Sequence, residues 1–159
     1  MKFSIIFITF FLNSFQSIKE GTFEKNISVP IRILGFDYCR EFQDSYFISG
    51  IGIEKDELQG SSFEREDFVI YLLKINYKGD IIWFNTYKTK YPPSKVIGLF
   101  ESGPDLFLVV TLEGFTDIRR QPPHPFYTVF LKVNHDGKLV KQIPFLGQAS
   151  SIAKTIDSS

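Results

Sequence analysis

The sequence predicts an all-β fold of antiparallel, four-stranded units shaped like propeller blades, with about two units and the start of a third. Two apolar runs in residues 68–87 flank the turn sequence Asn76-Tyr77-Lys78-Gly79. The same arrangement returns in residues 126–145, where Asn134 and Gly137 stand 58 positions after Asn76 and Gly79. Four short strands in about 55–60 residues are typical of a propeller blade or a related repeat module.

The apolar runs are continuous. Phe68–Ile75 and Leu106–Leu112 are apolar at nearly every position. A strand with one face in water alternates between apolar and polar residues, so a continuous run indicates a sheet that is covered on both faces. Neighbouring blades would supply that covering. A closed β-sandwich or barrel is the alternative architecture.

The turn residues indicate the hairpin type. An Asn side chain at the first turn position can accept hydrogen bonds from the backbone ahead of it. A Gly three places later suits the positive φ that a following bulge requires. We therefore expect structural turns at Asn76 and Gly79 and at Asn134 and Gly137.

The N-terminus predicts export. Lys2 precedes an apolar block, Phe3–Leu12, that is shorter than a membrane-spanning helix, and polar residues follow it. We interpret residues 1–17 as a signal peptide, with an uncleaved membrane anchor or a buried N-terminal strand as alternatives. Residues 18–30 then form a leader, in which Asn26-Ile27-Ser28 is a possible glycosylation site.

Turn signals divide the remaining chain into repeats. We expect unit 1 in residues 31–93, unit 2 in 94–148 and the start of a third unit in 149–159, with strands that include Ile31–Phe36, Tyr46–Ile53 and Lys95–Phe100. Residues 54–67 are polar and acidic and indicate a surface loop. Their carboxylates match no calcium-loop spacing, so we interpret them as a solvated surface.

Charge and residue counts argue against several classes of function. Eighteen basic and eighteen acidic residues cancel, which does not favour a nucleic-acid partner. The single cysteine, Cys39, cannot form an intramolecular disulfide, and we expect a buried thiol. His124 and His135 are too few for a zinc site, and no catalytic motif is present. We expect no metal, no cofactor and no enzymatic activity.

One loop carries side chains that suit ligand binding. Arg119, Arg120 and His124 lie beside a proline-rich run in residues 113–125. Arginines can bind acidic groups, so this is a candidate ligand-facing loop, although solvated charges explain it more simply.

The two halves of each unit resemble an exported β-propeller-like repeat family. Its consensus runs roughly S-I-x-x-T-x-D-G-G-Y-I-x-x-G and then L-x-K-x-D-x-x-G-x-x-x-W. The matching segments are Asp44–Gly50, Leu72–Trp83, Leu131–Gly137 and Ser151–Asp157. Unit 2 departs from the pattern, with Lys141 in place of the Trp and Ser102-Gly103-Pro104-Asp105 at the Asp-Gly-Gly corner.

The resemblance implies a binding or scaffolding role outside the cell and brings no catalytic residues. We therefore expect a non-catalytic, exported propeller-type interaction module that is part of a larger repeat protein, with an unknown protein or glycan partner. The alternatives are part of an enzyme whose active site lies in missing blades, and a degenerate product without function.

Two units cannot close a propeller ring, which normally needs at least four blades. We expect apolar outer faces on the terminal units, with Leu108, Val110, Val129 and Leu131 of unit 2 among the exposed residues. Such faces lead to self-association or to pairing with additional blades.

The signal-peptide hypothesis predicts a processed N-terminus. Secreted protein should begin between about residues 15 and 20, as is usual for the length of such signals. N-terminal sequencing of secreted material measures this directly. An intact Met1 in a soluble intracellular fraction would contradict export.

Overall fold

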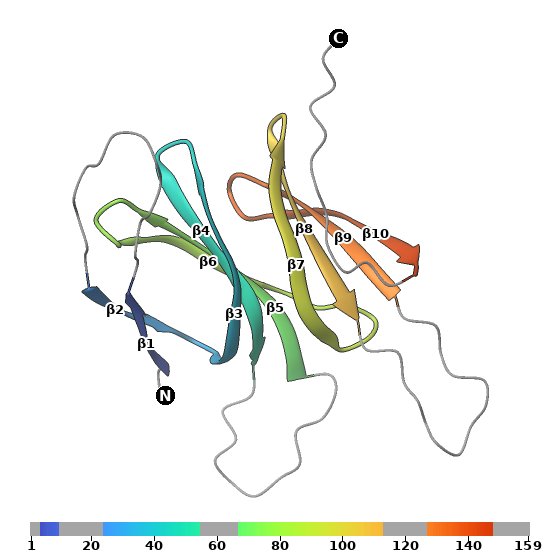
Figure 1. The fold of residues 1–159 in the computed structure, drawn as a ribbon, viewed down its shortest axis with the longest axis horizontal. Coiled ribbons are helices and arrows are strands. Elements are labelled where there is room, and N and C mark those ends of the chain that lie inside the picture. Colours follow the sequence, from blue (N-terminus) through green and yellow to red (C-terminus); the bar gives the residue numbers. More distant parts are fainter. Residues whose placement is uncertain (1–3, 10–23, 55–66, 113–126, 148–159) are drawn as a thin grey trace, which may run out of the picture.

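The computed structural model describes residues 4–9, 24–54, 67–112 and 127–147 (Figure 1). These residues form ten strands in three antiparallel sheets and no α-helix, which confirms the all-β prediction. The strands are β1 (Ser4–Thr9), β2 (Glu24–Val29), β3 (Arg32–Phe42), β4 (Ser45–Ile53), β5 (Phe68–Asn76), β6 (Ile81–Tyr87), β7 (Pro93–Ser102), β8 (Asp105–Leu112), β9 (Tyr127–Asn134) and β10 (Leu139–Leu146).

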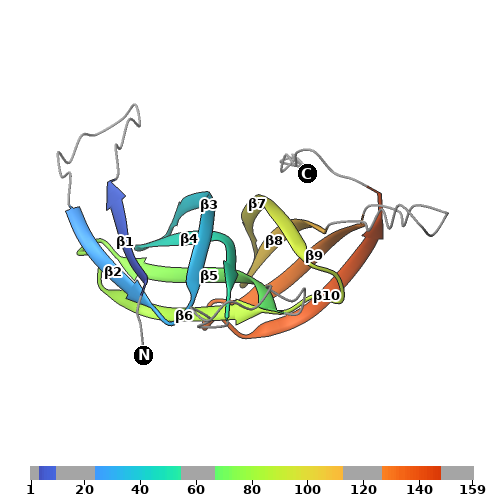
Figure 2. The ribbon, with the colours of Figure 1, turned by 90° about the horizontal axis from the view of Figure 1, so that it is seen from below.

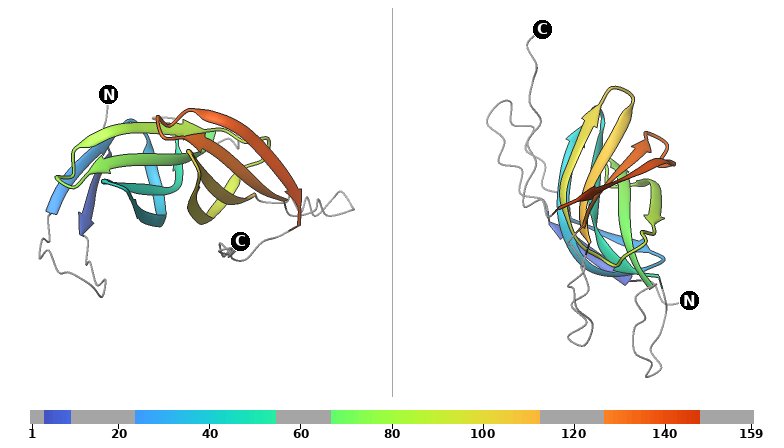
Figure 3. Two further views of the ribbon diagram at one scale, coloured as in Figure 1. Left: turned by 90° about the horizontal axis from the view of Figure 1, so that it is seen from above. Right: turned by 90° about the vertical axis from the view of Figure 1, so that its right-hand side faces the viewer.

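The two repeat units are two four-stranded meanders. Unit 1 has the order β3-β4-β5-β6 and unit 2 the order β7-β8-β9-β10, and neither closes into a barrel within the described residues. The sheets follow one another along an arc, with the β1–β2 pair at one end and unit 2 at the other (Figures 2 and 3). In each unit we call the side that faces the next unit along the chain the leading side, and the opposite one the trailing side.

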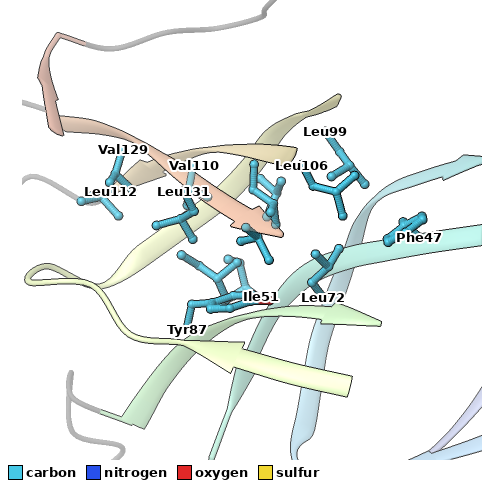
Figure 4. Close-up of a cluster of buried hydrophobic side chains, with 14 residues drawn as sticks. Phe47, Ile51, Leu72, Tyr87, Leu99, Leu106, Val110, Leu112, Val129 and Leu131 are labelled. Atoms are coloured by element: carbon cyan, nitrogen blue, oxygen red, sulfur yellow. The ribbon is translucent and has the colours of Figure 1, made fainter. Parts of the chain in front are cut away.

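The main core lies between the two units (Figure 4). The leading side of unit 1 contributes Phe47, Ile51, Ile70 and Leu72, and strands β7, β8 and β9 of unit 2 cover them with aliphatic side chains. The continuous run in β5 is covered on both faces, as predicted, because Val69–Leu73 are all 0% exposed.

The prediction that four apolar residues of unit 2 are exposed is wrong. Leu108, Val110, Val129 and Leu131 lie on the trailing side, against unit 1, and none is more than 3% exposed. A continuous apolar run does not reveal which of its alternating positions faces the neighbour, because both sets have the same composition.

The residues predicted as a leader include a covering strand. In β2, Ile27 and Val29 are buried, whereas Asn26 and Ser28 are exposed, so the strand alternates as one with a single buried face. Together with Ile31, these side chains pack on Tyr46, Ile48, Tyr71 and other residues of the trailing side of unit 1.

β1 comes from the predicted signal peptide. Ser4–Thr9 pairs with Glu24–Val29 in antiparallel register. This agrees with the alternative of an N-terminal strand in the unprocessed chain, and cleavage of residues 1–17 stays a prediction.

The β3–β4 and β7–β8 hairpins have two-residue loops that correspond between the units. Gln43 (φ 52°) in the first loop stands where Gly103 (φ 60°) stands in the second. Only glycine adopts this left-handed conformation without a steric penalty. Gln43 is the one non-glycine residue with positive φ in the described part of the chain.

Replacing Gln43 by glycine should therefore relieve backbone strain. We expect Gln43→Gly to raise the free energy of unfolding by about 0.5–1 kcal/mol, since the left-handed penalty exceeds the entropy that glycine adds to the unfolded chain. Denaturant unfolding measures the difference. Gln43→Ala is the control and should not stabilise; equal effects of both substitutions would contradict strain at this position.

Candidate functional site

The sequence-predicted ligand loop lies outside the described residues. This holds for Arg119, Arg120 and His124, and also for the start of the third unit. Asn26 is described, and its side chain is exposed on β2, where a glycan would have room. The interaction surfaces that the structure does describe lie elsewhere, at the junction of the two units and at the two ends of the arc.

Both predicted Asn-x-x-Gly turns have the expected geometry. Gly79 has φ 77° and Gly137 has φ 81°. The Asn76 Oδ1 accepts hydrogen bonds from the amides of Lys78 and Asp80, both at 2.9 Å. A register shift follows each turn, in β6 and in β10, as a bulge requires.

Asn134 organises the second turn in the same way. Its Oδ1 accepts hydrogen bonds from the amides of Asp136 at 3.2 Å and Lys138 at 2.8 Å. The Gly137 amide closes the turn on the Asn134 carbonyl at 2.9 Å. Each turn is therefore fixed mainly by its own residues.

The second turn also docks on β6. We call the last strand of each unit, β6 or β10, its outer strand and the first, β3 or β7, its inner strand. The Trp83 indole N–H donates to the His135 carbonyl at 3.0 Å, and the Tyr87 hydroxyl donates to the Gly137 carbonyl at 2.8 Å. Gly137 lies so close to β6 that a Cβ atom there would meet the Asn85 amide and approach the Trp83 ring to 2.9 Å. Burial raises the pKa of Tyr87 well above its usual range, so its hydroxyl stays a donor at physiological pH.

An imidazole, a carboxylate and two aromatic rings surround this contact. The His135 Nε2 lies 3.2 Å from the Glu101 carboxylate within unit 2. The Phe47 ring of unit 1 meets the His135 ring edge-on at 6.4 Å and the Trp83 ring at 5.9 Å. The junction is therefore a mixed contact in which apolar packing surrounds two directed hydrogen bonds.

Among the described residues, none covers the outer strand of unit 2, β10, in this way. Phe145 stands 58 positions after Tyr87, and its exposed fraction is 56% where that of Tyr87 is 5%. Ile143 corresponds to Asn85 and Lys141 to Trp83, and both are exposed. We call Lys141, Ile143 and Phe145, which share one side of β10, the β10 surface.

The 58-residue repeat in the sequence carries a signal for the β10 surface. The 58-residue repeat aligns β10 with β6 position by position, and β6 is the strand that the second turn covers. β10 has Ile143 and Phe145 at the positions of Asn85 and Tyr87, and these apolar side chains predict a surface for a further turn.

A second exposed apolar surface lies at the other end of the arc. Leu34 and Phe36 on the inner strand β3 are 49% and 47% exposed. Cys39 is exposed on the same strand, so the prediction of a buried thiol is wrong. Its burial would require a sheet on the trailing side of β3, and the described residues place none there. We call Leu34, Phe36 and Cys39 the β3 edge.

The thiol of Cys39 is a weak nucleophile despite its exposure. Desolvation by the surrounding protein raises its pKa to about 11, and nearby Arg40 offsets only part of that effect. Little thiolate exists at neutral pH, and the thiolate is the reactive form. At neutral pH the side chain is therefore mostly the neutral thiol.

The described residues hold no group of three or more His, Cys, Asp or Glu side chains that could share a metal ion. In the same part of the chain, no helix is long and apolar enough to cross a membrane. Comparison with family models, with curated proteins and with solved structures gives no match to this chain.

The docking of the second turn predicts unequal costs at two glycines with positive φ. Gly137→Ala and Gly103→Ala both force alanine into the left-handed region, but the new Cβ atom would have neighbours within 4 Å only at Gly137, namely Asn85 and Trp83. We expect Gly137→Ala to cost about 1–3 kcal/mol more, as is usual for overpacking. Thermal or denaturant unfolding compares the two.

Gly103→Ala is the control, because Gly103 also has positive φ but has open space around it. Equal destabilisation by both substitutions would show that the turn does not pack on β6 in solution.

Proposed function

We propose that this chain is a non-catalytic, exported β-propeller-type interaction module that binds further four-stranded β units end to end. The observation that carries the proposal is the contrast between two equivalent outer strands. Tyr87 in β6 is 5% exposed beneath the second turn, whereas Phe145 in β10 is 56% exposed.

The junction of units 1 and 2 indicates what the β10 surface binds. At that junction, the carbonyls of His135 and Gly137 accept hydrogen bonds from Trp83 and Tyr87. A further unit with an Asn-x-x-Gly turn would present the same two carbonyls to β10. Lys141, at the Trp83 position, has an ammonium group that can donate to the first of them.

Ile143 and Phe145 make the β10 surface more apolar than the corresponding part of β6. They replace Asn85 and Tyr87, so a contact at β10 would depend more on apolar burial and less on hydrogen bonds. Large exposed apolar side chains that gather on one strand mark interaction sites more often than scattered ones do.

Export is supported by the N-terminal apolar block and by the exposed sequon residue Asn26. A protein that consists of similar units is the partner that the junction favours. A glycan partner would require the loop with Arg119, Arg120 and His124, which lies outside the described residues.

The test is the association state of the secreted chain. Without a further unit, the β10 surface should drive self-association, because exposed apolar patches and free strand edges associate. Sedimentation velocity should detect oligomers of the wild type, and Phe145→Asp and Ile143→Asp should shift the protein toward the monomer.

Ile82→Asp is the matched control. Ile82 is a 49% exposed aliphatic residue on β6, the outer strand of unit 1, and unit 2 leaves it uncovered. This substitution should leave association unchanged. A wild-type monomer, or an equal effect of Ile82→Asp and Phe145→Asp, would overturn the assignment of β10 as the binding surface.

A further inference from the structure

The trailing sides of the two units differ most at their inner strands. Val96 and Leu99 of β7 are 0% and 4% exposed, because unit 1 covers them. The residues 60 positions earlier in β3 are Phe36, 47% exposed, and Cys39, exposed. The β3 edge is therefore the surface that a preceding inner strand would cover.

The backbone of the two inner strands is interrupted at the same place. The pairing of β3 with β4 shifts register between Phe36 and Tyr38, and the pairing of β7 with β8 shifts between Val96 and Gly98. A bulge removes one residue from the ladder and turns its backbone groups outward. Both units thus present a bulge on the inner strand.

Unit 1 binds the bulge of unit 2 with two side chains. The Asp37 carboxylate accepts a hydrogen bond from the Val96 amide at 2.8 Å, and the Tyr38 hydroxyl donates to the Ile97 carbonyl at 2.6 Å. One carboxylate and one hydroxyl on adjacent residues therefore satisfy a donor and an acceptor of the bulge. The corresponding backbone groups of β3 are the amide of Phe36 and the carbonyl of Asp37.

The middle strands of the same side, β4 and β5, are already covered. Ile27 and Val29 of β2 are 2% and 1% exposed against unit 1. In Figure 2 the β1–β2 pair flanks β3–β6 on the side away from unit 2, so β2 covers the trailing side of unit 1. None of the described residues covers the β3 edge from this end.

We propose that the β3 edge is the docking site for an inner β-strand of a separate polypeptide that carries a carboxylate residue followed by a tyrosine. The carboxylate binds the Phe36 amide, the tyrosine hydroxyl binds the Asp37 carbonyl, and apolar side chains cover Phe36 and Cys39. This site rests on the proposed function, of which it defines the partner at the other end of the arc.

A second copy of this chain does not fit the site through its unit 2. Its inner strand has Ile97 and Gly98 where unit 1 has Asp37 and Tyr38, so neither the carboxylate nor the hydroxyl is present. Its outer strands would also meet β2, which occupies that part of the trailing side. The partner therefore lacks its own outer strand and has the inner-strand chemistry of β3.

The probe is a synthetic peptide of residues 31–44 with Cys39→Ser, since β3 is the strand that binds such a bulge within the chain. The protein is the secreted chain with Phe145→Asp, so that association through β10 does not interfere. Fluorescence anisotropy of a labelled peptide measures binding. Slow alkylation of the protein's Cys39, at a mildly alkaline pH that keeps the peptide tyrosine protonated, reports whether the β3 edge is covered.

The expected results are saturable binding and slower alkylation of Cys39 in the presence of the peptide. A control peptide with Asp37→Asn and Tyr38→Phe should bind about tenfold more weakly, because it lacks the charged acceptor and the hydroxyl donor. Phe36→Asp in the protein should weaken binding by a similar factor, whereas Ile82→Asp should not.

Several outcomes would overturn the proposal. They are no binding up to about 1 mM peptide, equal binding of both peptides, binding without protection of Cys39, and binding that Phe36→Asp leaves unchanged. Circular dichroism must show that Phe36→Asp keeps the β fold; if it does not, Phe36→Ala replaces it. None of these results depends on the β10 surface, so the two proposals fail separately.

Discussion

A strand that is apolar on both faces must be covered on both sides, and the arrangement of the described chain follows from that requirement. Val69–Leu73 in β5 are 0% exposed because unit 2 covers one side of the sheet and β2 covers the other. Each buried aliphatic or aromatic side chain gains about 1.5–3 kcal/mol over exposure. The sheets therefore stack in series, and in the described part of the chain large apolar side chains stay exposed on β3 and β10.

The second Asn-x-x-Gly turn closes the β9–β10 hairpin and also connects unit 2 to unit 1. Asn134 satisfies the backbone within the turn, which leaves the carbonyls of His135 and Gly137 to accept from Trp83 and Tyr87. Glycine at position 137 provides the positive φ and also the space that β6 fills. Each of the two hydrogen bonds contributes about 0.5–1.5 kcal/mol, and their directions fix how one unit sits on the next.

The sequence predicted the fold class and the turns, because these depend on local residues. Asn76 and Gly79 specify a hairpin by their own chemistry, whatever surrounds them. The sequence did not predict which side of unit 2 is buried or that Cys39 is exposed, because both depend on the presence of a neighbouring sheet. β2 was only partly predictable. Its sequence alternates between polar and apolar residues at Asn26–Val29, as a strand with one buried face does, but its position before the first unit predicts a leader. The β10 surface could not be predicted from the sequence alone, because its prediction depends on the contact between the second turn and β6, which only the structure shows.

The inner-strand bulges give the stack a direction and an order. Asp37 and Tyr38 project from β3 to bind the bulge of β7, but β7 itself carries Ile97 and Gly98 and cannot bind a third bulge in the same way. Unit 1 therefore carries the side chains that bind the bulge of the following unit, and unit 2 lacks their counterparts. Repeat units that differ in this way assemble in one sequence, because a wrong neighbour leaves a buried amide or carbonyl without a partner, at about 1–3 kcal/mol for each group.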